Sequence, residues 1–469
     1  MKNVLLINPP WVIGEDKNLW KEVAASWPSL GLAYIAAVLE QSKHKVYYLD
    51  CSAEQLTVGD TKKVLEDKYS GIDFIGFTAT TPLINNALAI AKESKKIFPN
   101  AKIVFGGVHA SVYPDEILAK DYVDYLVIDE GEETMKELVD GKNVEDILGL
   151  YYKKNNKIIK NSLRPLVASL DNIPPPAYHL LPIDKYHPPI GGYKRLPSMS
   201  ILATRGCPGR CTYCYRTFRG RVRKRSAKNI INEINILQAK YGIKEIAFYD
   251  DTFTIFRDLV EEFCRIVIEE KIDITWSCLT RVDCVDEDLF RIMKKAGCHS
   301  ILIGVESADE KILENINKRI SLKQVKKAMD LAKKVGLDTR ASFMFGNQGE
   351  TEDTIKRTID FAIELDPNEA IFNITIPYPG TEMFFWAKEK GYIKSFNWDD
   401  YSYSNVVLEL PGLNREKLQY YYNLAHRKFY FRPKIILRRL SNIRSWDQFI
   451  QEVKGGLALF KFLYAKYKK

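Results

Sequence analysis

The sequence predicts an α/β protein with a doubly wound N-terminal parallel sheet, then a partial (β/α)6 barrel of the TIM type, and finally a helical C-terminal tail. Short apolar runs alternate with amphipathic stretches along the first 400 or so residues, as repeated βαβ units do. A stretch at 161–197 with 8 of the 20 prolines interrupts this alternation. The 469 residues also exceed what one hydrophobic core usually holds. We therefore expect two α/β domains joined by a linker.

The first domain is expected over residues 1–150. Its strands are predicted at 4–8, 45–49, 73–78, 102–107 and 124–128, with helices such as 31–41 and 83–97 between them. Parallel sheets of this kind bind ligands at the carboxyl ends of their strands. The candidate binding residues at those ends are Asn8, Pro9, Thr78, Thr80, Gly106, Gly107, His109, Glu130 and Gly131.

A proline-rich linker is expected at 151–197, followed by the barrel at 198–400. Barrel strands are predicted at 200–204, 245–250, 274–278, 300–306, 339–346 and 370–376. Helical patterns fill the gaps, for example 226–240, 286–296 and 321–336. The active site of such a barrel opens at the C-terminal ends of its strands.

Three cysteines follow the first predicted barrel strand, in GCPGRCTYCYR. Cys207, Cys211 and Cys214 have the spacing Cys-x3-Cys-x2-Cys, whereas a structural zinc site needs four ligands, usually as two separated pairs. Iron–sulfur clusters are held by cysteine thiolates, normally four. Three thiolates on a four-iron cluster would leave one iron open for a ligand. A three-ligand zinc site and ligand-free loop cysteines remain as alternatives.

These residues resemble the radical S-adenosylmethionine (SAM) enzymes, whose motif is CxxxCxΦC with an aromatic Φ, here Tyr213. The resemblance implies a [4Fe-4S] cluster on the three cysteines, with SAM bound to the open iron and cleaved to a 5′-deoxyadenosyl radical. Further matches lie at later strand ends, in Tyr249-Asp250-Asp251 and in Gly304-Val305-Glu306-Ser307. The cofactor-binding residues implied on this side are Tyr213, Asp250, Arg281, Gly304, Glu306 and Arg340.

Paired with such a barrel, the first domain resembles the Rossmann-like cobalamin-binding domain of B12-dependent radical SAM enzymes. The matching stretches are Asn8-Pro9-Pro10, 28–34, 106–110 and 130–132. The motif DxHxxG, whose histidine binds cobalt in many cobalamin proteins, is absent. His109 is therefore expected near the corrin or its tail, or else in a structural role, and a relic domain without cobalamin is the further alternative. The loop after the first strand lacks GxGxxG, which disfavours a nicotinamide cofactor.

The resemblance implies methylation of an unactivated carbon, through a 5′-deoxyadenosyl radical and methylcobalamin. Two alternatives stay open at this point. One is an oxidative cyclase or ring-rearranging enzyme of the same architecture, and the other is a module that senses cobalamin or redox state.

The C-terminal region, 401–469, is basic and rich in aromatic residues. From His426 onward it has 12 Lys and Arg against 2 Asp and Glu, so it accounts for the net charge of +9. It is expected either to pack as a helical cap on the barrel or to contact an anionic membrane surface, and nucleic-acid binding is disfavoured because no such motif accompanies it. No apolar run is long enough to span a bilayer, and MKNVLLINPP is predicted to form a strand. We therefore expect a cytoplasmic protein. Peripheral contact of the tail with the inner membrane face is a further expectation. The expected partners are a small-molecule or lipid-like substrate and an electron donor such as flavodoxin or ferredoxin.

Overall fold

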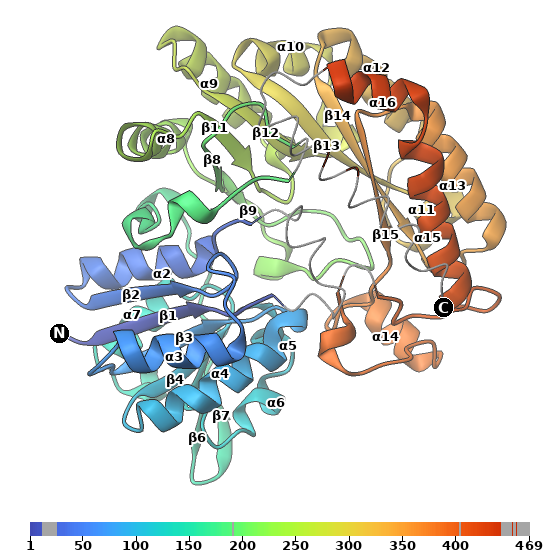
Figure 1. The fold of residues 1–469 in the computed structure, drawn as a ribbon. Helices are drawn as coiled ribbons and strands as arrows, with labels where there is room; N and C mark the ends of the chain where they lie inside the picture. Colours follow the sequence, from blue (N-terminus) through green and yellow to red (C-terminus); the bar gives the residue numbers. More distant parts are fainter. Residues whose placement is uncertain (12–25, 190–191, 403–404, 442–452, 454–455, 457–469) are drawn as a thin grey trace.

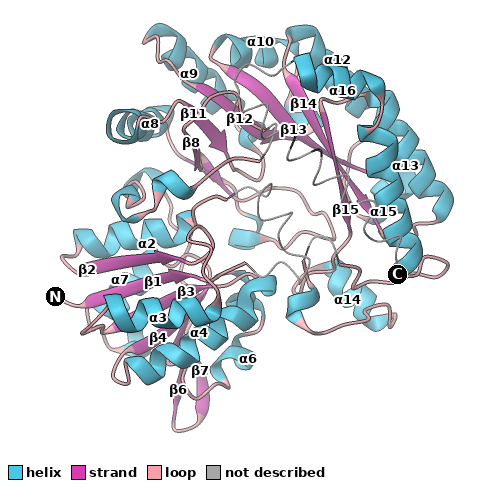
Figure 2. Cartoon of the chain, in the orientation of Figure 1, coloured by secondary structure: helices cyan, strands magenta, loops and turns pink. Residues whose placement is uncertain are grey.

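The computed structural model describes residues 1–11, 26–189, 192–402, 405–441, 453 and 456. It contains two mainly parallel sheets that lie side by side, with helices packed on them and a helical tail on the second sheet (Figure 1). The predicted fold class is confirmed. Figure 2 shows how the helices surround both groups of strands.

The first sheet has the strand order β2-β1-β3-β4-β5-β6-β7, and β1 to β5 run parallel. Alternate residues of the interior strand β1 enter different cores, with Val4 and Leu6 on one face and Leu5 and Ile7 on the other. A strand buried on both faces reads as a continuous apolar run, which is why the sequence reveals it. The strands are β1 (Asn3–Asn8), β2 (Lys45–Asp50), β3 (Phe74–Thr78), β4 (Lys102–Gly106), β5 (Tyr125–Val127), β6 (Leu150–Lys154) and β7 (Lys157–Lys160).

Residues 150–160 differ from the expectation, because they form an antiparallel hairpin of the first sheet instead of the start of the linker. Asn155 and Asn156 form its two-residue turn with φ values of 51° and 59°. Asparagine tolerates this left-handed conformation better than most residues, and it is favoured in such turns. The Asn-Asn pair between two short alternating runs is the signal that the sequence interpretation missed.

Helices cover both faces of the first sheet. Helices α2 and α7 share one core with it, and α3 and α4 share the other. The helices are α2 (Leu30–Gln41), α3 (Val58–Lys68), α4 (Ile84–Ile97), α5 (Val108–Val112), α6 (Pro114–Leu118) and α7 (Glu132–Val139).

The second sheet is open, with the order β15-β14-β13-β12-β11-β8 and every pairing parallel. The predicted first strand is split, because the Ala203 amide donates to Asp250 instead of a neighbouring strand. Its second part, β9 (Thr204–Arg205), pairs with β10 (Arg223–Lys224) in a short antiparallel ribbon. The six sheet strands are β8 (Ser198–Ile201), β11 (Glu245–Phe248), β12 (Thr275–Thr280), β13 (Cys298–Glu306), β14 (Asp338–Phe345) and β15 (Glu369–Ile374).

Helices between these strands cover the outside of the second sheet, as in a partial barrel (Figure 1). Most begin with a side-chain cap; Ser226, for example, accepts from the Asn229 amide at the start of α8. The helices are α8 (Ala227–Tyr241), α9 (Arg257–Glu269), α10 (Glu287–Lys295), α11 (Glu310–Asn315), α12 (Leu322–Val335), α13 (Glu352–Leu365) and α14 (Glu382–Glu389).

The tail is helical, as expected, in α15 (Arg415–Tyr430) and α16 (Pro433–Ser441). Helix α15 packs on α13 and β15 and buries Tyr422, His426 and Phe429, so its apolar face is a cap on the second sheet. The stretch GLALFKFLYAKYKK, apart from Gly456, lies outside the described residues. In the described part of the chain, no helix has the length and apolar character needed to cross a bilayer.

Candidate functional site

The three motif cysteines lie in a loop, residues 206–222, whose two ends are held together by the ribbon β9–β10. We call it the cysteine loop. Gly206 opens it with a φ of 96°, and a Cβ atom there would collide with the carbonyl of Arg221. Glycine is required at this position for both reasons. The loop is therefore closed at its base by a backbone contact that excludes a side chain.

Gly209 lies between two of the thiols. A Cβ atom there would be 3.2 Å from the Cys207 sulfur and 3.9 Å from the Cys211 sulfur, and the Gly209 amide donates to the Cys207 sulfur at 3.4 Å. The Cys214 amide donates to the carbonyl of Cys211 at 3.1 Å, which turns the chain back within the loop. The backbone of Gly209, which has no side chain, therefore lies next to the sulfurs of Cys207 and Cys211.

The three motif thiols are the candidate ligands of a metal group in this loop. Among the described residues, no three His, Cys, Asp or Glu side chains converge closely enough to hold one metal ion. A zinc ion would require such convergence, because its ligands share one tetrahedral centre. In an iron–sulfur cluster, by contrast, each cysteine binds a separate iron, so the sulfurs lie farther apart. Three cysteine thiols in one loop are the kind of donor that a cluster uses.

Glu306 ends β13 next to the cysteine loop in an unusual backbone conformation. Its φ is 68°, and the β13–β14 register shifts between Gly304 and Glu306. Its carboxylate accepts hydrogen bonds from Lys318 Nζ at 2.7 Å and from the Tyr213 hydroxyl at 3.1 Å. Non-glycine residues in this backbone region cluster at binding sites. Tyr213, Gly304 and Glu306 are therefore brought together, as their places in the motifs predict.

Lys318 is a site residue that the sequence interpretation missed. It is 8% exposed, and a Cβ atom on Gly304 would lie 2.7 Å from its Nζ atom. Burial opposes its charge, but Glu306 and the neighbouring cysteines outweigh burial and raise the pKa of Lys318. Lysine is almost never buried unless it is paired. The partner of Lys318 lies 12 residues away in the chain, so no local sequence pattern indicates that this lysine is buried.

The two predicted arginines and Asp250 all have protein partners. Arg281 forms a bidentate pair with Asp283 at 2.9 Å for both bonds, and its Nη1 would lie 3.6 Å from a Cβ atom on Gly209. Arg340 is paired with Glu369 across β14 and β15. The structure thus brings Arg281 to the cysteine loop, whereas Arg340 is bound within the sheet.

Asp250 holds the entry to the cysteine loop. Its carboxylate accepts from the Ala203 amide at 3.0 Å and from the Thr204 hydroxyl at 2.6 Å. Full burial raises its pKa to about 6, although these hydrogen bonds oppose the shift. The side chain therefore fixes the chain between β8 and β9.

Polar residues at the carboxyl edge of the first sheet form a connected group. Asn8 donates to Asp50 at 2.8 Å, and Tyr186 of the linker donates to the other Asp50 oxygen at 2.8 Å. Pro9 is buried beside them, and Thr80 is exposed. The linker is thus fastened to the edge where the cofactor-binding residues were predicted.

The glycines at this edge have different surroundings. At Gly107, whose φ is 91°, a Cβ atom would lie 3.0 Å from Thr78 Oγ1 and 2.9 Å from the carbonyl of Ala79. At Gly106 the nearest atom would be the Val127 carbonyl at 3.6 Å. Gly107 therefore allows close packing of two loops, while Gly106 leaves space at the strand end.

His109 lies below this edge and has no exposed surface. Its Nδ1 is 3.1 Å from Thr81 Oγ1, and its ring centroid is 5.3 Å from that of Trp398 and 5.5 Å from that of Tyr113. Burial lowers its pKa to about 4, so the imidazole is neutral at pH 7. Its Nε2 atom has no hydrogen-bond partner among the described residues, which suits an additional polar group at this position.

Glu130 and Gly131 connect the first sheet to the cysteine loop. Glu130 is 6% exposed and forms ion pairs with Arg205 and Arg223, the residues of the ribbon that closes the loop. At Gly131 a Cβ atom would lie 2.9 Å from Ile35 of α2, so glycine permits close packing there. The loops at the carboxyl ends of both sheets therefore meet.

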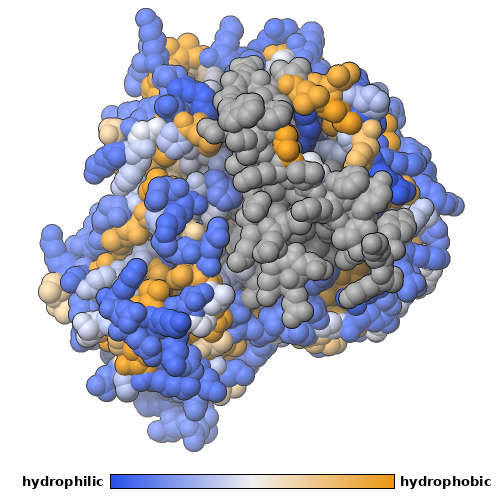
Figure 3. Space-filling view, viewed as in Figure 1, coloured by the Kyte–Doolittle hydropathy of each residue, from blue (hydrophilic) through white to orange (hydrophobic). Residues whose placement is uncertain are grey.

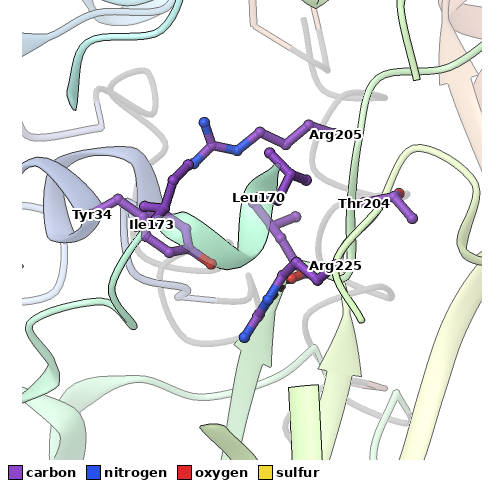
Figure 4. Close-up of a pocket in the computed structure, with 7 residues that line it drawn as sticks. Tyr34, Leu170, Ile173, Thr204, Arg205 and Arg225 are labelled. Atoms are coloured by element: carbon purple, nitrogen blue, oxygen red, sulfur yellow. Dashed lines mark hydrogen bonds between the residues drawn. The ribbon is translucent and has the colours of Figure 1, made fainter. Parts of the chain in front are cut away.

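A small pocket lies at this junction, lined by Tyr34, Leu170, Ile173, Leu202, Thr204, Arg205 and Arg225 (Figure 4). Its floor is ordered by polar contacts, since Arg225 donates to the Leu202 carbonyl at 2.8 Å and is paired with Glu233. The guanidinium of Arg205 lies 5.2 Å from the centroid of the Tyr34 ring.

Comparison with known protein families gives one match in the first domain and one in the barrel. Residues 201–362 match the model of the radical SAM superfamily, and residues 19–139 match the model of the B12-binding domain. The chain is 36% identical over 442 residues to an uncharacterized methyltransferase of Pyrococcus horikoshii, a match that covers 93% of this chain and 94% of the relative.

Two further comparisons agree in architecture. The anaerobic magnesium-protoporphyrin IX monomethyl ester cyclase of Rubrivivax gelatinosus is 27% identical, with 88% of this chain and 75% of that protein covered. The cobalamin-dependent SAM radical enzyme OxsB, solved with aqua-cobalamin and SAM, has a TM-score of 0.73 at 16% identity; the match covers all of this chain and 73% of OxsB. The chain therefore belongs to the cobalamin-dependent radical SAM enzymes, whose cofactors are a [4Fe-4S] cluster, SAM and cobalamin.

Proposed function

We propose that this enzyme transfers a methyl group from SAM to an unactivated carbon of a small-molecule or lipid-like substrate. The observation that carries the proposal is the 36% identity, over nearly the whole length of both chains, to a protein named as a methyltransferase. The cofactors of the family supply what such a reaction needs. The cluster together with SAM would supply a 5′-deoxyadenosyl radical, and cobalamin would supply a methyl carrier.

The chain's own residues provide binding and positioning in this proposal. Cys207, Cys211 and Cys214 hold the cluster, and Glu306 with Lys318 offers SAM a buried charged pair beside it. A carboxylate can accept from the amino group of SAM, while an ammonium can donate to its carboxylate. The short contacts of Lys318, Tyr213 and Glu306 support this assignment.

We also assign Arg281, Gly304 and Asp250 to the SAM side, with Asp250 acting through the backbone it fixes. Arg340 remains a candidate SAM-binding residue. To bind SAM it must either release Glu369 or contact SAM and Glu369 at the same time. For cobalamin we propose the strand-end loops that contain Asn8 and Pro9, Thr78 and Thr80, Gly106 and Gly107, His109, and Glu130 and Gly131. The unpartnered Nε2 atom of His109 supports a polar neighbour at that position.

An oxidative cyclisation is the second candidate function. It is favoured by the match to the anaerobic ester cyclase over 88% of this chain. Both reactions would begin with the same radical, so the position of the substrate relative to the methyl carrier separates them. The barrel residues near the cysteine loop give no preference between the two.

Anaerobic reconstitution with iron, sulfide and hydroxocobalamin tests the proposal, with SAM labelled on its methyl group and a metabolite extract of the source organism as the acceptor pool. With titanium(III) citrate added as the reductant, we expect 5′-deoxyadenosine together with a labelled product. A new product without label, formed with 5′-deoxyadenosine, would replace methylation by cyclisation or rearrangement. A Cys207→Ala chain treated identically is the control, because it cannot hold the complete cluster.

We further propose a cytoplasmic enzyme that receives its electrons from flavodoxin or ferredoxin and touches an anionic membrane surface through its tail. Ile436, Leu437 and Leu440 of α16 are 44%, 66% and 54% exposed among basic residues, and an apolar group overlies α16 in Figure 3. Sedimentation with phosphatidylglycerol vesicles tests the membrane contact. Leu437→Asp should reduce binding, whereas Leu163→Asp, at an exposed position of the linker, should not.

A further inference from the structure

Arginines from the cysteine loop and its ribbon meet a run of acids in the first domain. The acids lie between β5 and the first turn of α7, at the carboxyl edge of the first sheet. The pairs are Arg219 with Asp129, Arg205 with Glu130 and Glu132, and Arg223 with Glu130. We call these six residues the clasp.

The buried part of the clasp uses both oxygens of Glu130. Oε1 accepts from Arg205 at 2.7 Å and from Arg223 at 2.9 Å, and Oε2 accepts from Arg223 and from the Val167 amide, both at 2.8 Å. Arg205 also donates to Glu132 at 2.5 Å. Since β9 carries Arg205 and β10 carries Arg223, one carboxylate of the first domain holds both ends of the cysteine loop.

The outer part of the clasp lies within the loop itself. Phe218 and Arg219 have φ values of 51° and 54°, a left-handed conformation that non-glycine residues rarely adopt, least of all in succession. Arg219 Nε donates to Asp129 at 3.0 Å. The Phe218 ring lies against two guanidinium groups, 5.9 Å from Arg205 and 5.2 Å from Arg223. Arg219 Nη2 also donates to the Arg164 carbonyl of the linker at 2.6 Å. Contacts to the first domain, the linker and the ribbon thus hold the strained turn in place, and Asp129 is the first domain's part in it.

Joining the two domains does not require these pairs. Leu30, Ala33 and Tyr34 of the first domain belong to the same apolar core as Ile201 and Ala203 of the barrel. Buried ion pairs contribute little to net stability because both charges lose water, but they demand a particular geometry. The clasp is therefore better suited to fixing a position than to holding the domains together.

We infer that the acids at 129–132 position the cysteine loop, so that the cobalamin-binding domain keeps the cluster ligands in their working conformation. Arg205, Arg219 and Arg223 are then positioning residues and not cluster ligands. The inference rests on the proposed function only in assigning the cluster to the three cysteines; it does not require that the product be methylated.

The exposed pair, Arg219 with Asp129, allows a charge-reversal test in the full-length chain. We would compare Asp129→Arg, Arg219→Asp and the double reversal, each reconstituted with iron and sulfide. The matched control is the same set of reversals at Arg195 and Asp273, a bidentate surface pair at the entry to β8. The first measurement is hydrogen exchange of the peptide 206–222, which needs no substrate or turnover.

Each single reversal should speed exchange in 206–222 by about tenfold, because the strained turn opens when its anchor is lost. The signal of the reduced cluster in electron paramagnetic resonance after SAM addition should change as well, and formation of 5′-deoxyadenosine with titanium(III) citrate should fall several-fold. The double reversal should restore all three. The pair at Arg195 should leave all three unchanged.

Wild-type exchange in both single reversals would overturn the inference, and so would a double reversal no better than the singles. A failure of the proposed function looks different. In that case the wild-type chain forms no labelled product, while the exchange pattern of the reversals is unaffected.

Discussion

At the scale of the residue, the site depends on charged side chains that are buried as pairs. Glu306 and Lys318 are each less than 10% exposed and lie beside the cysteine loop. The penalty for taking both charges out of water is large, so such a pair is weak evidence for stability. The place of this pair next to the three motif cysteines is better explained by the charged groups of a bound molecule.

The motif cysteines give the first prediction. Cys214→Ser should lose most of the iron taken up on reconstitution and nearly all 5′-deoxyadenosine formation, because two thiolates do not hold a cluster that needs three. Iron content and deoxyadenosine by chromatography measure this. Cys264→Ser, at a buried thiol of α9 outside the motif, is the control and should retain both. Equal losses in the two chains would contradict the assignment.

The Glu306–Lys318 pair gives the second prediction. Lys318→Met leaves a buried carboxylate without its cation, so the free energy of unfolding in urea should fall by about 3–5 kcal/mol. The double variant Glu306→Leu with Lys318→Met should be no less stable than the worse single variant, since no unpaired charge remains.

SAM binding separates this pair's ligand role from its structural one. We expect the affinity for SAM to fall at least tenfold in the double variant, measured by calorimetry, even where stability recovers. Normal SAM binding by the double variant would show that the pair is structural only.

At the scale of the element, the tail helix α15 behaves as part of the barrel. His426 lies between aromatic side chains, with its ring 5.3 Å from Phe372 and 4.5 Å from Tyr422, and its Nδ1 donates to the Tyr422 carbonyl at 2.9 Å. Burial lowers the pKa of His426 to about 4. The imidazole is therefore neutral in the folded protein over most of the acidic range.

This burial gives the third prediction, a pH dependence. In the unfolded chain His426 takes up a proton below pH 6.5, while the folded protein resists protonation down to about pH 4, so stability is lost as the pH falls through that interval. Between pH 7 and pH 5 the wild type should lose about 2 kcal/mol more unfolding free energy than His426→Phe.

The comparison uses the pH slope because the phenylalanine also removes one hydrogen bond, an effect that is the same at each pH. Urea unfolding at several pH values measures the slopes. Parallel slopes in the two chains would mean that α15 is not packed on the barrel in solution.

At the scale of the whole molecule, two apolar cores cross the domain boundary. One combines α2 with the barrel, and the other combines the first sheet with the turn Trp398–Asp400 and with Tyr401. Trp398 also donates to Glu116 of α6 at 3.0 Å. The segment that contains Trp398 and Tyr401 therefore packs against the first domain, at a contact separate from that of α2 with the barrel.

The shared cores give the fourth prediction. Trp398→Ala should lower the unfolding free energy by about 3–5 kcal/mol, as expected for a large buried aromatic side chain. Because the cores are shared, both domains should lose stability together in one calorimetric transition. Phe385→Ala, at a position that is 60% exposed on α14, should change the stability by less than about 0.5 kcal/mol. Two separate transitions, with only one shifted, would contradict the coupling.

The sequence by itself determined the order of the two α/β units and the kind of chemistry. Buried parallel strands appear as apolar runs, and the cysteine spacing with its aromatic residue is local, so both can be read along the chain. The hairpin at 150–160 could also have been predicted, from its Asn-Asn turn.

Only the tertiary structure decided which charges share a site. Lys318 follows Glu306 by 12 residues and meets it in a buried pair, and Arg205 meets Glu130 from 75 residues away. Such pairings carry no period or motif, because they follow from where strand ends and loops converge in space. For this reason the sequence could predict the cluster ligands, whereas the structure alone revealed the buried pair beside them and the ion pairs of the clasp.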